Sequence, residues 1–147
     1  MIVSVAGTVR PVRTNTSDFA AAGGAGLRAF ANIAERWGLT VAEQLKLLGI
    51  ASRSTFFKWR REREPRLPQD TLERLSYLLG IYKALQILLP DPRAADEWVR
   101  KPNAATPFGG GSALDRMLSG QVADLYVVRL HAAGPGTGGV CGRPDPA

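Results

Sequence analysis

Residues 40–62, "TVAEQLKLLGIASRSTFFKWRRE", contain the signals that decide how the chain folds. Thr40 stands where a helix N-cap belongs, and Glu43 three residues later completes the pattern of a capping box. The apolar residues that follow predict a helix ending at Gly49, and Ser52 can cap a second helix after it. The stretch therefore predicts two short helices joined by a turn that contains glycine.

The second of these helices is expected to carry its charge on one side. Helical spacing turns Phe56, Trp59 and Thr55 inward. The residues on the outward face are then Arg53, Ser54, Phe57, Lys58 and Arg61. Residues 53–66 hold six basic and two acidic side chains, and this excess of four is most of the net charge of +6 of the whole chain. A basic helix of this kind favours a polyanionic partner.

Two short helices with Arg, Ser and Lys near the start of the second match the helix-turn-helix plan for entering a DNA major groove. We expect Arg53 and Lys58 to contact bases, because Arg bonds guanine with two parallel hydrogen bonds. Phosphate contacts are expected from Arg60, Arg61 and Arg63, while Ser54 can reach either bases or phosphates. The alternative is a solvated face of an ordinary helical protein. That alternative gives the exposed Phe57 no role, whereas in a groove its ring could touch a thymine methyl.

The rest of the 147-residue chain, which is 45% apolar, predicts an all-α protein. Residues 68–89 predict a long helix that is apolar over more than half of its surface. Such a helix is either buried between two units or presents apolar surface to a second copy, so we expect at least a homodimer. The expected organisation is a flexible arm at 1–25, a helix-turn-helix domain at 26–66, a helical dimerisation and partner-binding domain at 67–134 and a flexible tail at 135–147.

Several classes of function are disfavoured by composition. The single Cys141 and the single His131 offer no internal disulfide and no cluster with metal-ligand spacing. There is no glycine loop with phosphate-cradling spacing and no carboxylate pair on one helix face, so we expect no enzyme, no cofactor and no metal. The N-terminal charges follow the apolar run instead of preceding it, which is wrong for a secretory signal, and no segment is long enough to span a membrane. A cytoplasmic protein is expected.

The order of motifs through residues 26–133 resembles the Xre/MbcA/ParS-type antitoxins. The residues that match the family's C-terminal pattern are Trp98, Pro102, Asn103, Gly109, Gly110, Leu114, Leu118, Gly120, Val127, Leu130 and Gly134. The family usually has a proline shortly after its Gly-Gly pair, whereas this chain has "PFGGGSALDRML".

The resemblance implies a helix-turn-helix followed by a small helical toxin-binding domain. It implies a cognate toxin of the RES-domain type that consumes NAD, and repression of the shared promoter by binding operator DNA. The toxin-binding residues implied are Trp98, Asn103, Gly109, Gly110, Arg129 and Arg143. Trp98 could instead be a core anchor and Asn103 a loop cap, and the tail could either obstruct the toxin's active site or stay unbound. The alternative function is a stand-alone helix-turn-helix repressor without a toxin partner.

Overall fold

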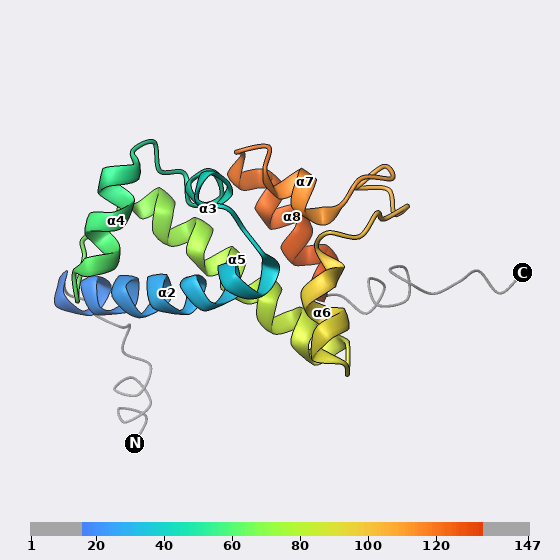
Figure 1. Ribbon diagram of the computed structural model, residues 1–147, viewed down its shortest axis with the longest axis horizontal. Coiled ribbons are helices and arrows are strands. Elements are labelled where there is room, and N and C mark those ends of the chain that lie inside the picture. The colour runs from blue at the N-terminus through green and yellow to red at the C-terminus, as the bar shows by residue number, and fades with distance from the viewer. Residues whose placement is uncertain (1–15, 134–147) are drawn as a thin grey trace, which may run out of the picture.

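The computed structural model describes residues 16–133 and shows an all-α protein over that range, as the sequence predicts (Figure 1). Seven helices and no strand occur in these residues. The helices are α2 (Thr16–Trp37), α3 (Val41–Leu48), α4 (Arg53–Arg61), α5 (Gln69–Leu88), α6 (Pro92–Trp98), α7 (Ala113–Met117) and α8 (Val122–Ala133).

Helix α5 crosses the middle of the molecule and packs against helices on both sides (Figure 1). It contacts α2 and α3 towards one end of the molecule, and α6 and α8 towards the other. Leu78, Ile81 and Leu85 are completely buried along it. Burial between two units, one of the two alternatives for this helix, is therefore what the structure shows, although Ile87 near its end remains 75% exposed. Across residues 16–133 no helix has the length and apolar character needed to cross a membrane.

Helix α2 begins ten residues before the expected start at residue 26, so the interpretation of residues 16–25 as part of an arm is wrong. Each glycine in a helix interior costs about 1 kcal/mol relative to alanine, which made this segment look non-helical. Tertiary packing overrides that cost. A Cβ placed on Gly24 would lie 2.3 Å from the backbone oxygen of Arg63, and one on Gly23 would lie 3.1 Å from Leu67 Cδ1. The glycines allow α2 to approach the connection between α4 and α5.

The C-terminal helices begin at well-defined caps. Pro92 occupies the first turn of α6, where its missing N–H costs nothing. Ser112 and Asp115 form a capping box that starts α7. On α8, Val128 is completely buried and faces the core.

Candidate nucleic-acid interface and protein-binding loop

Helix α3 begins and ends where the sequence predicts, and α4 begins at its predicted cap. The Thr40 hydroxyl accepts a hydrogen bond from the Glu43 backbone N–H at 3.1 Å, and the Glu43 carboxylate accepts one from the Thr40 N–H at 2.9 Å. Gly49 ends α3 with φ 71°, a left-handed conformation that favours glycine. Ser52 caps α4 by accepting from the Thr55 N–H at 3.2 Å. The capping box, the turn and the second cap are thereby confirmed.

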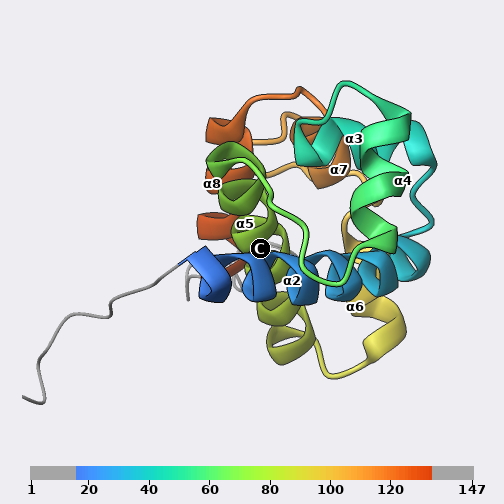
Figure 2. The ribbon, with the colours of Figure 1, turned by 90° about the vertical axis from the view of Figure 1, so that its left-hand side faces the viewer.

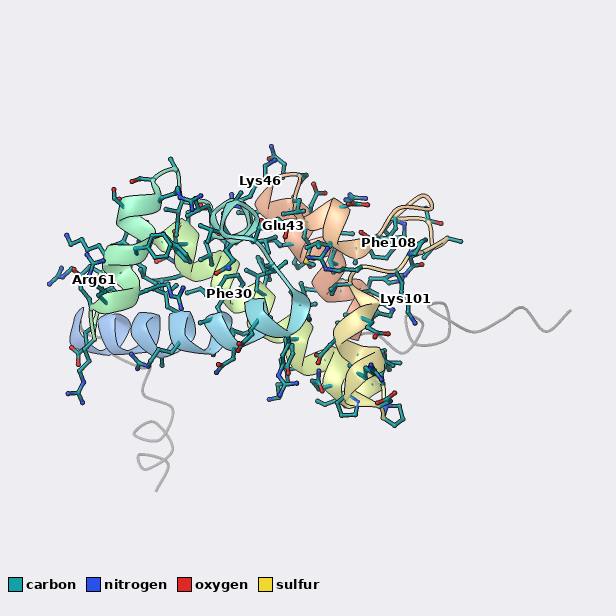
Figure 3. The ribbon with its side chains drawn as sticks, viewed as in Figure 1. Phe30, Glu43, Lys46, Arg61, Lys101 and Phe108 are labelled. Carbon is teal, nitrogen blue, oxygen red and sulfur yellow. The ribbon has the colours of Figure 1, made fainter. Side chains whose placement is uncertain are left out.

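Helix α4 has one buried side and one exposed basic side. Phe56 is completely buried, and Trp59 is half-buried against the core. The exposed residues of the helix are Arg53, Ser54, Phe57, Lys58, Arg60 and Arg61. Figure 2 shows α4 on the molecular surface, and in Figure 3 the Arg61 side chain points away from the body of the protein. Arg63 follows just beyond the helix and is also exposed. We name residues 53–63 the basic helix face.

Two of the cations on this face have neighbours within the helix. The Arg60 guanidinium lies 5.6 Å from the centre of the Phe56 ring, a cation–π contact that holds it along the helix. Lys58 pairs with Glu62 at 3.8 Å, and both side chains are exposed. An exposed pair of this kind contributes about 0–1 kcal/mol, so a phosphate can replace Glu62 at little cost.

The structure adds one cation to this face that the sequence analysis missed. Arg28 of α2 donates from Nη1 to the backbone oxygen of Arg63 at 3.4 Å. It also lines a groove of about 360 Å³ between α2 and α4, together with Trp59 and Arg60. No local pattern could have placed Arg28 there, because its position depends on how closely α2 packs against the residues after α4.

A second surface is formed by the connection between α6 and α7, which projects from the opposite end of the molecule (Figure 1). Pro102 and Ser112 form an isolated antiparallel bridge at its base. Asn103 closes the loop: its N–H donates to Gly111 O and its carbonyl accepts from the Gly110 N–H, both at 2.9 Å. The Asn103 side chain accepts from the Ala105 N–H at 2.9 Å, which makes it the loop cap considered as an alternative. We name residues 99–112 the hairpin loop.

Gly109 and Gly110 are exposed on this loop and have φ values of 55° and 95°. A Cβ on either residue would meet no other atom within 4 Å. As far as residues 16–133 are concerned, glycine is therefore needed here for its backbone conformation and not for packing. Because nothing in the described structure covers these two residues, a partner's backbone could approach them closely.

A cluster of aromatic rings in edge-to-face contact supports the hairpin loop. The Trp98 and Phe108 rings are nearly perpendicular with centres 6.1 Å apart, and Phe108 meets His131 of α8 in the same way at 5.0 Å. Phe108 is buried and Trp98 is half-buried, so Trp98 acts largely as the anchor considered as an alternative. Burial lowers the pKa of His131, which keeps the ring neutral at pH 7. Phe108 was not among the predicted site residues.

The loop is also fixed to the start of α8. Arg116 donates from Nη1 to the Pro107 carbonyl and from Nε to Asp124 Oδ1, the latter at 2.7 Å. Hydrogen bonds from Ser119 and from Arg116 lower the pKa of Asp124, which keeps this carboxylate ionised.

The predicted toxin-binding residues do not all come together. Trp98, Asn103, Gly109 and Gly110 belong to the hairpin loop or its support. Arg129 lies elsewhere, because its side chain packs over Gly80 of α5, while His131 two positions later faces the loop. Arg143 lies outside the described residues.

Comparisons with known proteins agree with this division into two surfaces. Residues 18–80 match the antitoxin Xre-like helix-turn-helix domain, and residues 84–129 match the antitoxin Xre/MbcA/ParS C-terminal toxin-binding domain. The first match includes most of α5, which the sequence analysis had assigned to the second domain. The chain is also 52% identical to an uncharacterized protein, y4oB of Sinorhizobium fredii (strain NBRC 101917 / NGR234), over 105 residues that are 71% of this chain and 79% of that protein. With a helix-turn-helix domain that presents an exposed basic helix, followed by a toxin-binding domain that presents the hairpin loop, the chain belongs to the Xre/MbcA/ParS-type antitoxin family.

Proposed function

We propose that this antitoxin represses its own operon by placing the basic helix face in operator DNA, and that it neutralises a RES-domain toxin that consumes NAD. The observation that carries the proposal is the separation of its two surfaces. Arg61 of the basic helix face and Phe108 of the hairpin loop lie towards opposite ends of the molecule (Figure 3). DNA and a toxin could then be bound at the same time.

The chemistry of the basic helix face suits a DNA groove. Arg53 and Ser54 stand in the first turn of α4, which is the part of a recognition helix that reaches base edges. Phe57 is 36% exposed beside them, available to a thymine methyl. Arg61 and Arg63 lie at the far end of the face, where phosphate contacts are expected. The family match to a helix-turn-helix domain supports this role for α4.

The DNA half of the proposal is tested by mobility-shift titration against the chain's own promoter and against a random duplex of equal length. A preference for the promoter at moderate salt is expected. If the two duplexes bind equally at every salt concentration, the repressor role is wrong, because phosphate contacts alone carry no sequence information.

The toxin half rests on the toxin-binding domain and on the open backbone at Gly109 and Gly110. Residues after Gly134 are proposed to enter the toxin's active-site cleft, since a chain rich in Gly and Pro can fill a cleft that a rigid helix cannot enter. The test compares the full chain with one truncated after Gly134, each co-expressed with the product of the neighbouring gene. Loss of neutralisation with retained binding is expected. Full neutralisation by the truncated chain would assign inhibition to residues 98–130 alone.

We also propose that the antitoxin acts as at least a dimer, because paired operator half-sites require paired recognition helices. A groove of about 630 Å³ between α2 and α5 offers a face for the second copy. Its lining includes the half-buried Leu79 and Tyr82 as well as the oppositely charged Glu35 and Arg36, which suits a self-complementary contact. Sedimentation showing a monomer at tens of micromolar, with and without DNA, would remove this part of the proposal.

A further inference from the structure

Helix α3, the first helix of the helix-turn-helix pair, is held at its start by a residue of the toxin-binding domain. Arg100 donates from Nε to the Trp37 carbonyl and from Nη2 to the Gly38 carbonyl, each at 2.8 Å. The same Nη2 lies 3.5 Å from Glu43 Oε1. These bonds join residues separated by 57 to 63 positions in the chain.

The groups that Arg100 bonds lie at the junction between α2 and α3. The Trp37 and Gly38 carbonyls lie at the end of α2, where a helix leaves backbone oxygens without a partner in the helix. Glu43 is the carboxylate that caps the first turn of α3. One guanidinium therefore fixes the end of α2, the turn and the first turn of α3 together, and its planar fork gives these bonds a defined geometry.

The end of α3 is held in a comparable way. Arg74 of α5 is 9% exposed, and a Cβ on Gly49 would lie 2.6 Å from its Nε, so its side chain packs directly against the turn of the helix-turn-helix. It donates from Nη2 to the Gly120 carbonyl in the toxin-binding domain at 3.0 Å. Thr71, one turn earlier, donates to the Leu48 carbonyl at 3.2 Å. Helix α3 is thus held at its start by Arg100, which belongs to the toxin-binding domain, and at its end by Arg74, which bonds that domain.

The backbone of Arg100 is part of the hairpin loop. Its neighbour Val99 is completely buried and accepts a hydrogen bond from the Leu114 N–H at 2.8 Å. Trp98, which precedes Val99, belongs to the aromatic cluster that supports the loop. A partner seated on the loop therefore acts on the same short segment from which Arg100 reaches α3, and Figure 3 shows Glu43 between the two ends of the molecule.

We infer that Arg100 is a positioning residue that couples the hairpin loop to the DNA-binding face, so that occupancy of either surface strengthens binding at the other. The inference rests on the proposed DNA-binding function. Helices α2 and α3 both pack against α4, and Arg100 bonds the end of α2 and the first turn of α3, so these bonds help to position the basic helix face. DNA that restrains α3 also restrains the segment around Arg100. A toxin that restrains the hairpin loop reduces the conformational entropy that is lost when DNA binds. Linkage makes the effect equal in both directions.

The experiment measures hydrogen exchange of the full chain with and without saturating promoter duplex, with saturation checked by fluorescence anisotropy. DNA should slow exchange of the Gly110 and Leu114 amides at least about fivefold, the lower end of typical couplings between sites. These amides bond within the toxin-binding domain and lie far from α4. In Arg100→Gln the slowing at both amides should be lost, while amides of α4 remain slowed by DNA.

The control variant Arg93→Gln removes the same charge from an exposed side chain of α6 that pairs only weakly with Glu97, so it should keep the slowing. Arg100→Lys keeps the charge but not the planar fork, and should recover only part of the effect. If Arg100→Gln does not fold, Glu43→Gln serves instead: its amide oxygen can still cap α3 and the two carbonyl bonds of Arg100 remain, but the ion pair is lost, so the slowing should be reduced.

The possible failures are distinguishable. A wild-type chain that binds no DNA overturns the proposed function, and this inference with it. A wild-type chain that binds DNA without slower exchange in the loop overturns the inference alone, and so does an Arg100→Gln variant that keeps the slowing.

Discussion

Replacing Gly24 with alanine tests the close approach of α2 to the residues after α4. The added Cβ would lie 2.3 Å from the Arg63 oxygen, whereas carbon and oxygen in contact need about 3.3 Å. The two segments must separate by about 1 Å, and because protein interiors are closely packed such overpacking costs about 1–3 kcal/mol. Removing a glycine from a helix returns about 1 kcal/mol. We expect a net loss of about 1 kcal/mol, seen as a fall in Tm of about 3–6 °C by circular dichroism.

Gly23→Ala is the matched control, one residue earlier in the same helix. There the new Cβ would meet Leu67 Cδ1 at 3.1 Å, the end of a flexible side chain that can move. The gain in helix propensity should then equal or exceed the cost, so Tm should stay the same or rise. The prediction also requires that Gly24→Ala weaken DNA binding, since it displaces Arg63. A Tm that rises in both variants would refute the packing of α2 against the Arg63 carbonyl.

Three further predictions concern the two surfaces and their support. Because burial lowers the pKa of His131, the unfolded chain binds the proton at this residue more readily than the folded chain does. The stability of the fold should therefore fall as the pH drops below about 6.5. His131→Phe should reduce the difference in Tm between pH 7.5 and pH 5.5. Arg53→Ala should lower discrimination between promoter and random DNA by about 1–3 kcal/mol in mobility-shift assays, whereas Arg61→Ala should weaken binding to both and reduce the salt dependence. Gly110→Ala should cost about 1–2 kcal/mol of backbone strain without a clash, and should weaken toxin binding in a pull-down by more than its effect on Tm implies.

The helix-turn-helix pair could be predicted in detail because its signals are local. A capping box needs only Thr40 and Glu43, the turn needs a glycine at residue 49, and the second cap needs Ser52. The inward and outward sides of α4 follow from helical spacing alone, so the exposed basic side chains were placed correctly. What they bind remains a prediction.

The features that the sequence did not reveal all depend on contacts between distant residues. The start of α2 was missed because its glycines are explained only by what lies against them. Arg100 and Arg74 show no sequence pattern with the carbonyl groups of Trp37, Gly38 and Gly120 that they bond, which lie 46 to 63 positions away along the chain. Arg129 was predicted to bind the toxin together with residues of the loop, and its side chain packs on α5 instead of beside them.

The shared motif of the toxin-binding domain combines residues with two different physical roles. Trp98 and Asn103 hold the hairpin loop, one through the Phe108 ring and the other through its hydrogen bonds to the loop backbone. Gly109 and Gly110 also bond the loop through their backbone N–H groups, but among the described residues no side chain packs at their Cβ positions, and only their backbone conformation requires glycine. Substitutions at the first pair should therefore change loop stability and partner binding together. Only substitutions at the second pair are expected to change partner binding by more than they change stability, so they test whether a toxin touches this face.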